Sequence, residues 1–216
     1  MRDRIIESVL AEKLIVIVRG VEKSKLIPLA EAMYEGGIRL LEVTYDATGK
    51  VSDEETAANI KTLADHFGDR MYIGAGTVIS PKQVELTKAA GGLFIISPDT
   101  NPEVIQKTRE LGMVSMPGAL TPSEMQLAHR NGADFVKVFP AADMGIGYIK
   151  AVKAPLSHLK MLAVGGIHDG NIPDYLKAGV YGVGVGSNII DKKLLAAEDY
   201  AGITKLAEKY VAITKG

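Results

Sequence analysis

The sequence predicts a single (β/α)8 barrel of the TIM-barrel type, with an extra helix at the N-terminus. Eight short apolar runs recur along the 216 residues, and helical patterns separate them. The runs lack polar alternation, which is typical of parallel strands that are buried on both faces. About eight strand-then-helix units fit a small barrel, and no linker or low-complexity segment divides the chain. We therefore expect one barrel domain over residues 1–216.

The elements follow one another in a regular order. The charged segment MRDRIIESVLAEK (1–13) is expected to form the extra helix across the bottom of the barrel. The expected strands are LIVIVR (14–19), LLEVTY (40–45), YIGAGT (72–77), LFIISP (93–98), MVSMPG (113–118), DFVKVFP (134–140), KMLAVGG (160–166) and YGVGVGS (181–187). Helical patterns such as SPKQVELTKAAGG (80–92) begin near Ser, Thr or Pro and end at Gly or Asn-Gly.

A doubly wound open sheet also alternates strands and helices, so it is the structural alternative. Its dinucleotide fingerprint is missing. The segment GVGVGS (182–187) contains glycines, but it lacks the G-x-G-x-x-G spacing and belongs to the last strand, not the first. The barrel is the better prediction.

Composition excludes several function classes. Twenty-five basic and 26 acidic side chains leave a net charge of -1, so no global field favours nucleic acid or an anionic membrane. The absence of cysteine excludes disulfides and thiolate chemistry, and the N-terminus does not resemble a secretory signal. The four histidines are scattered without metal-site spacing, so we expect no bound metal. A cytoplasmic location is expected.

Lys137 stands between valines in a strand that is otherwise apolar. If Lys137 points into the barrel, Phe135 and Phe139 share its face, because alternate strand residues point to opposite sides. The same alternation gives inward-facing sets of Ile15, Ile17 and Arg19 on the first strand, Leu40, Glu42 and Thr44 on the second, and Ile73, Ala75 and Thr77 on the third. A lysine, a glutamate, an arginine and a threonine can then meet at the top of the barrel, where the chemistry of such folds takes place.

Burial makes Lys137 a candidate nucleophile. An unpaired buried ammonium is costly, so its pKa falls or a carboxylate pairs with it. A neutral lysine can form a Schiff base with a ketone, and Glu42 could then transfer protons. The alternative is a structural Lys137–Glu42 ion pair that joins two strands, and residue types alone do not decide between the two.

Glycines at the ends of the last two strands predict a phosphate site. Gly165, Gly166 and Gly186 would let the backbone approach an anion closely, and Ser187 adds a hydroxyl donor. Barrels of this kind often bind phosphate there. The alternative is that these glycines serve only tight turns and packing.

Several motifs in order resemble the 2-keto-3-deoxy-6-phosphogluconate (KDPG) and 4-hydroxy-2-oxoglutarate (KHG) aldolases, a family of class I Schiff-base enzymes. The resemblance covers nearly the whole chain. The motifs are EGGIRLLEVT (35–44), IGAGTV (73–78), FIISP (94–98), MPGALTPSE (116–124), VKVFPA (136–141), GGI (165–167) and GVGS (184–187).

The resemblance implies roles for individual residues. Lys137 would form the Schiff base, and Glu42 would be the general acid/base. Thr77 would help hold the pyruvate carboxylate, and Arg19 would bind a substrate anion. The remaining implied substrate-binding residues are Pro98, Phe139, Gly165, Gly166, Gly186 and Ser187. Pyruvate and an aldehyde would be the products, no cofactor would be needed, and the assembly would be a homotrimer.

Two positions depart from the family pattern. Asp46 stands where some members have arginine, and Val164 stands where many have threonine. These changes bear on substrate choice and leave Lys137, Glu42 and Thr77 untouched. We therefore expect cleavage of a 6-phosphorylated keto-deoxy acid, with an unphosphorylated KHG substrate as an alternative.

Two further alternatives concern the chemistry itself. A phosphate-binding epimerase or decarboxylase barrel could use Lys137 only as a charge, but the D-x-K-x-x-D pattern of one decarboxylase group is not met by DFVKVFPAAD (134–143). A noncatalytic sugar-phosphate-binding barrel would have no need of lysine, glutamate and threonine together.

Overall fold

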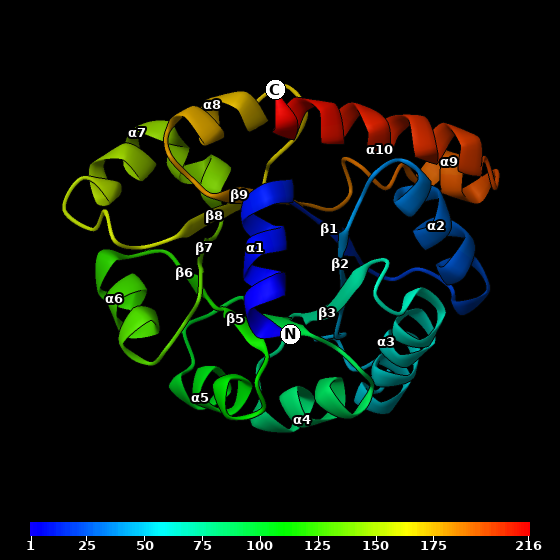
Figure 1. Ribbon diagram of the computed structural model, residues 1–216, viewed down its shortest axis with the longest axis horizontal. Helices are drawn as coiled ribbons and strands as arrows, with labels where there is room; N and C mark the ends of the chain where they lie inside the picture. Colours follow the sequence, from blue (N-terminus) through cyan, green and yellow to red (C-terminus); the bar gives the residue numbers. More distant parts are fainter.

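The computed structural model describes residues 1–216 and shows a barrel of parallel strands surrounded by helices (Figure 1). The order of the strands in the sheet is β5-β4-β3-β2-β1-β9-β8-β7-β6. The strands are β1 (Leu14–Val18), β2 (Leu40–Thr44), β3 (Tyr72–Gly76), β4 (Phe94–Ile96), β5 (Val114–Met116), β6 (Gly118–Ala119), β7 (Val136–Val138), β8 (Met161–Val164) and β9 (Gly182–Val185). The predicted α/β barrel is confirmed.

The strands β5 and β6 are two pieces of one predicted strand, separated by Pro117. The β5 piece pairs with β4, and the β6 piece pairs with β7, where Gly118 is the register partner of Lys137. The Lys137 N–H donates to the Pro117 carbonyl at 2.9 Å. A proline has no N–H to give to the ladder, so it commonly interrupts a strand. The nine segments thus make the eight predicted strands and bring the ring close to closure.

The helices lie outside the barrel, except for α1 (Arg2–Glu12), which crosses its open end (Figure 1). The others are α2 (Lys23–Glu35), α3 (Asp53–Phe67), α4 (Pro81–Ala89), α5 (Pro102–Glu110), α6 (Pro122–Arg130), α7 (Ala141–Lys153), α8 (Ile172–Lys177), α9 (Lys192–Ala196) and α10 (Tyr200–Lys215). None of them combines the length and the hydropathy needed to cross a lipid bilayer.

Local sequence explains where several helices begin. Three of them, α4, α5 and α6, have a polar cap residue followed by proline at the first helical position. The cap side chain accepts a backbone N–H of the first turn, which has no partner within the helix. Proline costs little at this position because its missing N–H would have had no partner. The caps predicted from Ser, Thr and Pro are therefore present.

The barrel wall separates two apolar clusters. The larger cluster lies between the strands and the outer helices and includes Val16, Leu41, Val136 and Ala163. The smaller one fills the barrel interior. Its members are Ile5, Val9, Ile15, Leu40, Phe94, Ile96, Val114, Met116, Phe135 and Leu162. The alternation of side chains predicted for the first, second and sixth strands agrees with this division.

The prediction for the third strand is wrong. Ile73 and Ala75 belong to the outer cluster, so Gly74 and Gly76 are the inward positions of β3. Neither glycine has room for a side chain. A Cβ on Gly74 would lie 2.3 Å from the Phe94 ring, and a Cβ on Gly76 would lie 1.5 Å from Glu42 Oε1. The inner face of β3 therefore has no side chains at these two positions, and the side chains of Phe94 and Glu42 fill the space beside it.

An ion-pair cluster fastens α1 to the barrel. The Asp134 carboxylate accepts hydrogen bonds from Arg2 of α1, from Arg109 Nη1 at 3.3 Å and from the Ser115 N–H at 2.9 Å. The Asp134 side chain is only 5% exposed, whereas the two arginines are partly open to solvent. Ile5 and Val9 of α1 enter the interior cluster, so the helix closes this end of the barrel.

Candidate active site

Lys137 lies on β7 and points into the barrel, as predicted. The side chain is 7% exposed, and Nζ lies 4.7 Å from the centroid of the Phe139 ring. Burial lowers the pKa of Lys137, and the positive charge of Arg19 lowers it further, while Glu42 opposes the change. Desolvation disfavours the charged form of an amine. The barrel therefore increases the neutral, nucleophilic fraction of Lys137.

Glu42 lies at the centre of β2, with 2% of its surface exposed. Burial raises its pKa to about 7, although Lys137 and Arg19 both lower it. The carboxylate oxygen Oε2 is buried and has no hydrogen-bond partner, and no salt bridge joins the carboxyl to Lys137. A tight structural ion pair would satisfy both groups, and the structure shows no such pair. A pKa near neutrality suits a group that must both take and return a proton.

Arg19 and Thr77 meet at the rim of the barrel. Arg19 Nη2 donates to Thr77 Oγ1 at 3.2 Å. Thr77 follows the end of β3 and has a left-handed backbone with φ of 57°. This conformation follows the inward-facing Gly76, and it places the threonine hydroxyl beside Arg19. The four predicted polar side chains thus gather at one end of the barrel.

Pro98 and Phe139 lie near the same rim. A Cβ on Gly118 would lie 2.3 Å from the Pro98 carbonyl oxygen, and Gly118 is the register partner of Lys137. Phe139 is 39% exposed and covers the lysine amine from the solvent side. Both residues are placed where they could contact a substrate bound to Lys137.

The two glycines that follow β8 have clear packing reasons, whereas Gly186, after β9, has room for a side chain. Gly165 and Gly166 have φ of 92° and 69°, and a Cβ on either would meet the Phe139–Ala142 segment at 3.2 Å or less. Gly186 and Ser187 line a pocket of about 630 Å³ together with Arg19. Lys25 and Lys192 also line this pocket, and Glu22 is its one acidic residue. Lys25 is also paired with Glu198 at 3.4 Å, so the pocket carries an excess of one positive charge.

A second pocket, of about 500 Å³, lies on the other side of the β1–α2 loop. Arg19 belongs to both pockets. In the second, Arg19, Lys23 and Lys50 are balanced by the acidic side chains Glu22, Asp46 and Glu55. Charge alone therefore directs an anionic group toward the pocket with Gly186 and Ser187.

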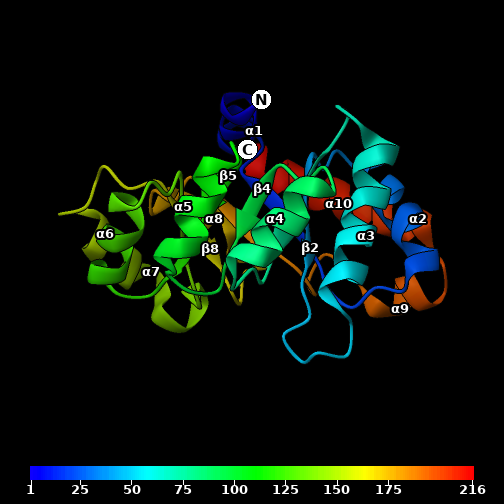
Figure 2. The same ribbon diagram turned by 90° about the horizontal axis from the view of Figure 1, so that it is seen from below.

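The two departures from the family pattern have different surroundings. Asp46 accepts hydrogen bonds from the backbone and hydroxyl of Thr48 and from the N–H groups of Lys50 and Val51. These bonds, led by that of the Thr48 backbone, lower its pKa to about 2. The carboxylate thus folds the β2–α3 loop, which extends from the side of the barrel opposite α1 (Figure 2). Val164 is 6% exposed, and its side chain packs against Gly184.

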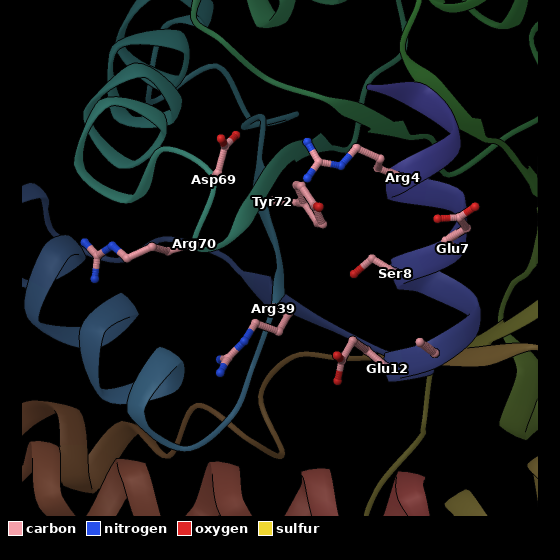
Figure 3. A pocket seen from close by; sticks show the side chains of 9 residues that line it. Arg4, Glu7, Ser8, Glu12, Arg39, Asp69, Arg70 and Tyr72 are labelled. Carbon is pink, nitrogen blue, oxygen red and sulfur yellow. The ribbon is translucent and has the colours of Figure 1, made fainter.

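A third depression, of about 460 Å³, lies at the opposite end of the barrel, beside α1. Its three arginines are balanced by Glu7, Glu12 and Asp69. Figure 3 shows the guanidinium groups of Arg39 and Arg70 directed away from Arg4. Both stack on the Tyr34 ring and donate to carbonyl groups at the ends of helices, so they serve the fold.

Sequence reasoning missed the part played by Gly76 and Gln83. Gly76 provides the space for the Glu42 carboxyl, and Gln83 anchors the turn that carries Thr77. The glycine could have been found by testing both alternations of the third strand. Nothing in the sequence distinguishes Gln83 from an ordinary residue in the first turn of a helix.

Comparison with known proteins agrees with this geometry. The family model of "KDPG and KHG aldolase" matches residues 5–206. The chain belongs to this family. It is therefore an aldolase, an enzyme that makes and breaks carbon–carbon bonds.

Individual relatives cover most of the chain. The 2-dehydro-3-deoxy-6-phosphogalactonate aldolase of Escherichia coli K12 is 33% identical over 82% of this chain and 83% of its own. The KHG/KDPG aldolase of the same strain is 34% identical over 91% and 89%. A crystal structure of the Legionella pneumophila KDPG aldolase, with pyruvate captured as a covalent carbinolamine, superposes with a TM-score of 0.84. It is 32% identical and covers 94% of this chain and 96% of its own.

Proposed function

We propose that the protein is a class I aldolase that cleaves a 6-phosphorylated 2-keto-3-deoxy acid to pyruvate and glyceraldehyde 3-phosphate, with Lys137 as the Schiff-base residue. The observation that carries the proposal is the buried pair of Lys137 and Glu42, whose pKa values move toward each other. Such opposite shifts within one apolar site are a mark of acid–base function. A carbinolamine of pyruvate in the Legionella relative supports covalent chemistry.

The reaction follows from this placement. The neutral amine of Lys137 attacks the C2 carbonyl and gives a carbinolamine. The protonated Glu42 carboxyl gives its proton to the carbinolamine hydroxyl, so that water leaves and an iminium ion forms. The Glu42 carboxylate takes the proton of the C4 hydroxyl, the C3–C4 bond breaks, and its electron pair moves into the imine to form an enamine. The aldehyde leaves. Protonation of C3 by Glu42 and hydrolysis of the imine then release pyruvate and restore the amine.

The remaining polar groups would orient the two ends of the substrate. Arg19 and Thr77 lie where the carboxylate next to the imine could be bound. The pocket with Gly186 and Ser187 would take the distal phosphate, because it has an excess of positive charge. Its volume of about 630 Å³ leaves room for the sugar chain as well as the phosphate.

The unphosphorylated KHG substrate is a second candidate, since one relative carries both names. The positively charged pocket favours the phosphorylated acid, because a phosphate brings more negative charge to its cations than the distal carboxylate of KHG does. A pyruvate-release assay should compare phosphorylated gluconate and galactonate derivatives with KHG. We expect the highest kcat/KM for a phosphorylated acid.

Borohydride trapping tests the mechanism. Pyruvate and borohydride should add a stable mass to the peptide that contains Lys137, and Lys137→Ala should lose both label and turnover. Lys160→Met is the matched control, because Lys160 Nζ lies 5.8 Å from the Phe135 ring centroid, close to the same strand. Label on another lysine, with Lys137 unmodified, would sink the mechanism.

We also propose a homotrimer, in keeping with the resemblance to the family. Light scattering during size-exclusion chromatography should give three times the chain mass of 23.0 kDa. A monomer at assay concentrations would contradict it.

A further inference from the structure

Thr77 has a backbone conformation that its side chain disfavours. Its φ of 57° lies in the left-handed region, which β-branched residues rarely enter. Such a conformation persists only where the surrounding structure holds it, and it is most common at functional sites. Whatever fastens the turn after β3 therefore controls where the Thr77 hydroxyl lies.

The Gln83 side chain holds the turn after β3. It is only 7% exposed, and both ends of its amide are used. Oε1 accepts the N–H of Ile79, two residues after Thr77, at 2.8 Å. Nε2 donates to Asp53 Oδ1, at the start of α3, at 3.0 Å. A single side chain thus joins the turn after β3 to the helix that follows β2.

The backbone of Gln83 is held as well. Its carbonyl accepts the Tyr45 hydroxyl at 3.1 Å and the Thr87 hydroxyl at 2.8 Å. Tyr45 is 1% exposed and directly follows β2, the strand of Glu42. Gln83 therefore lies at a junction between the Glu42 strand and the Thr77 turn.

Helix capping alone does not require this amide. Ser80 already caps α4 by accepting the Gln83 N–H. At the equivalent position of α6, Glu124 accepts the N–H groups of Leu120 and Thr121 through one oxygen, Oε2. A carboxylate is sufficient for that purpose. The amide of Gln83 differs because it also donates, and its donor is directed at Asp53.

We propose that Gln83 is a positioning residue that sets the affinity for the substrate carboxylate by holding Thr77 in its left-handed conformation. The proposal rests on the function proposed above, in which Thr77 helps bind that carboxylate. Gln83 acts through Ile79 and the turn and does not touch the substrate. Its loss should weaken carboxylate binding more than it slows the chemistry at Lys137.

Three variants test the proposal. Gln83→Met keeps the length of the side chain and removes both hydrogen bonds. Gln83→Glu keeps the acceptor for Ile79 but places a carboxylate against Asp53. Gln83→Glu combined with Asp53→Asn restores one donor and one acceptor with the direction of the bond reversed. Gln106→Met is the matched control, because the Gln106 amide donates to Asn131 Oδ1 at 2.8 Å between α5 and the end of α6.

The measurement is the pyruvate concentration that gives half-maximal borohydride labelling of Lys137. Gln83→Met should raise this concentration roughly 3- to 10-fold, the range for loss of the one hydrogen bond that reaches the Thr77 turn, that from Ile79, while maximal labelling is retained. Gln83→Glu should also raise the half-saturating pyruvate concentration, and the double variant should return this concentration to the wild-type value. Gln106→Met should leave it unchanged.

Two results would overturn the proposal. One is a wild-type pyruvate dependence in folded Gln83→Met, and the other is failure of the double variant to recover what Gln83→Glu has lost. If Gln83→Met does not fold, equal half-saturation in wild type and Gln83→Glu overturns the proposal instead. Failure of the proposed function is a separate result, because wild-type protein would then show no label on Lys137.

Discussion

Glu42→Gln should make the stability of the protein less sensitive to rising pH, even though it removes a group proposed for catalysis. Folding raises the pKa of Glu42 from 4.5 to about 7, so the native state holds this proton more tightly than the unfolded chain. The stabilising contribution is complete below pH 4.5 and is lost as the pH rises through 7. A shift of this size corresponds to about 3 kcal/mol. Glutamine does not titrate, so the variant escapes this loss.

Urea unfolding followed by circular dichroism measures the effect, since the chain has no tryptophan. The free energy of unfolding of Glu42→Gln minus that of wild type should rise by up to about 3 kcal/mol between pH 4.5 and pH 8. Glu208→Gln, at an exposed site on α10, should change this difference by less than about 0.5 kcal/mol. A constant difference for Glu42→Gln would show that this carboxyl is not desolvated and would contradict the prediction.

Four further outcomes are expected. Glu42→Gln should slow turnover by about 10²–10⁴ while imine formation persists, which pyruvate release and trapping check together; wild-type turnover would make Glu42 structural. Activity should survive excess EDTA, because the iminium ion of Lys137 accepts the electrons of the broken bond; restoration by zinc or magnesium after a loss would contradict this. Ser187→Glu should raise KM for a phosphorylated substrate and leave pyruvate trapping intact, whereas equal use of phosphorylated and unphosphorylated acids would remove the phosphate assignment. Gly76→Ala should displace the Glu42 carboxyl, because its Cβ would lie 1.5 Å from Oε1, and kinetics would show a loss of turnover; unchanged activity would mean that the carboxyl has another position.

Much of the fold could be predicted from the sequence because parallel strands buried on both faces leave a simple signal. Apolar runs alternate with capped helices, and each cap depends on residues close in sequence, as at Thr121 and Glu124. The break at Pro117 could not be predicted as a means of closing the barrel, since it depends on which strands lie on either side. Long-range pairing decided that feature.

The site could be predicted at the positions where a charged residue stands in an otherwise apolar strand. Lys137 and Glu42 interrupt apolar strands, so burial and charge conflict at those positions, and the structure places both inside the barrel. The inward face of the third strand was predicted wrongly because Ile73 and Ala75 would suit a core position on either face. Only the crowding around Gly74 and Gly76 shows which face is inward. Gln83 was missed because its partners, Ile79 and Asp53, come together only in the folded chain.

The helix α1 bears on the pKa values of Glu42 and Lys137, although it lies at the other end of the barrel. Ile5 and Val9 close the barrel end away from Lys137, and the buried Asp134 cluster holds the helix there. The apolar side chains of α1 help to keep water out of the interior, and burial is the main cause of the shifted pKa values of Glu42 and Lys137. We therefore expect that loss of Arg2, which loosens this helix, changes the solvation of the reacting groups although it touches none of them.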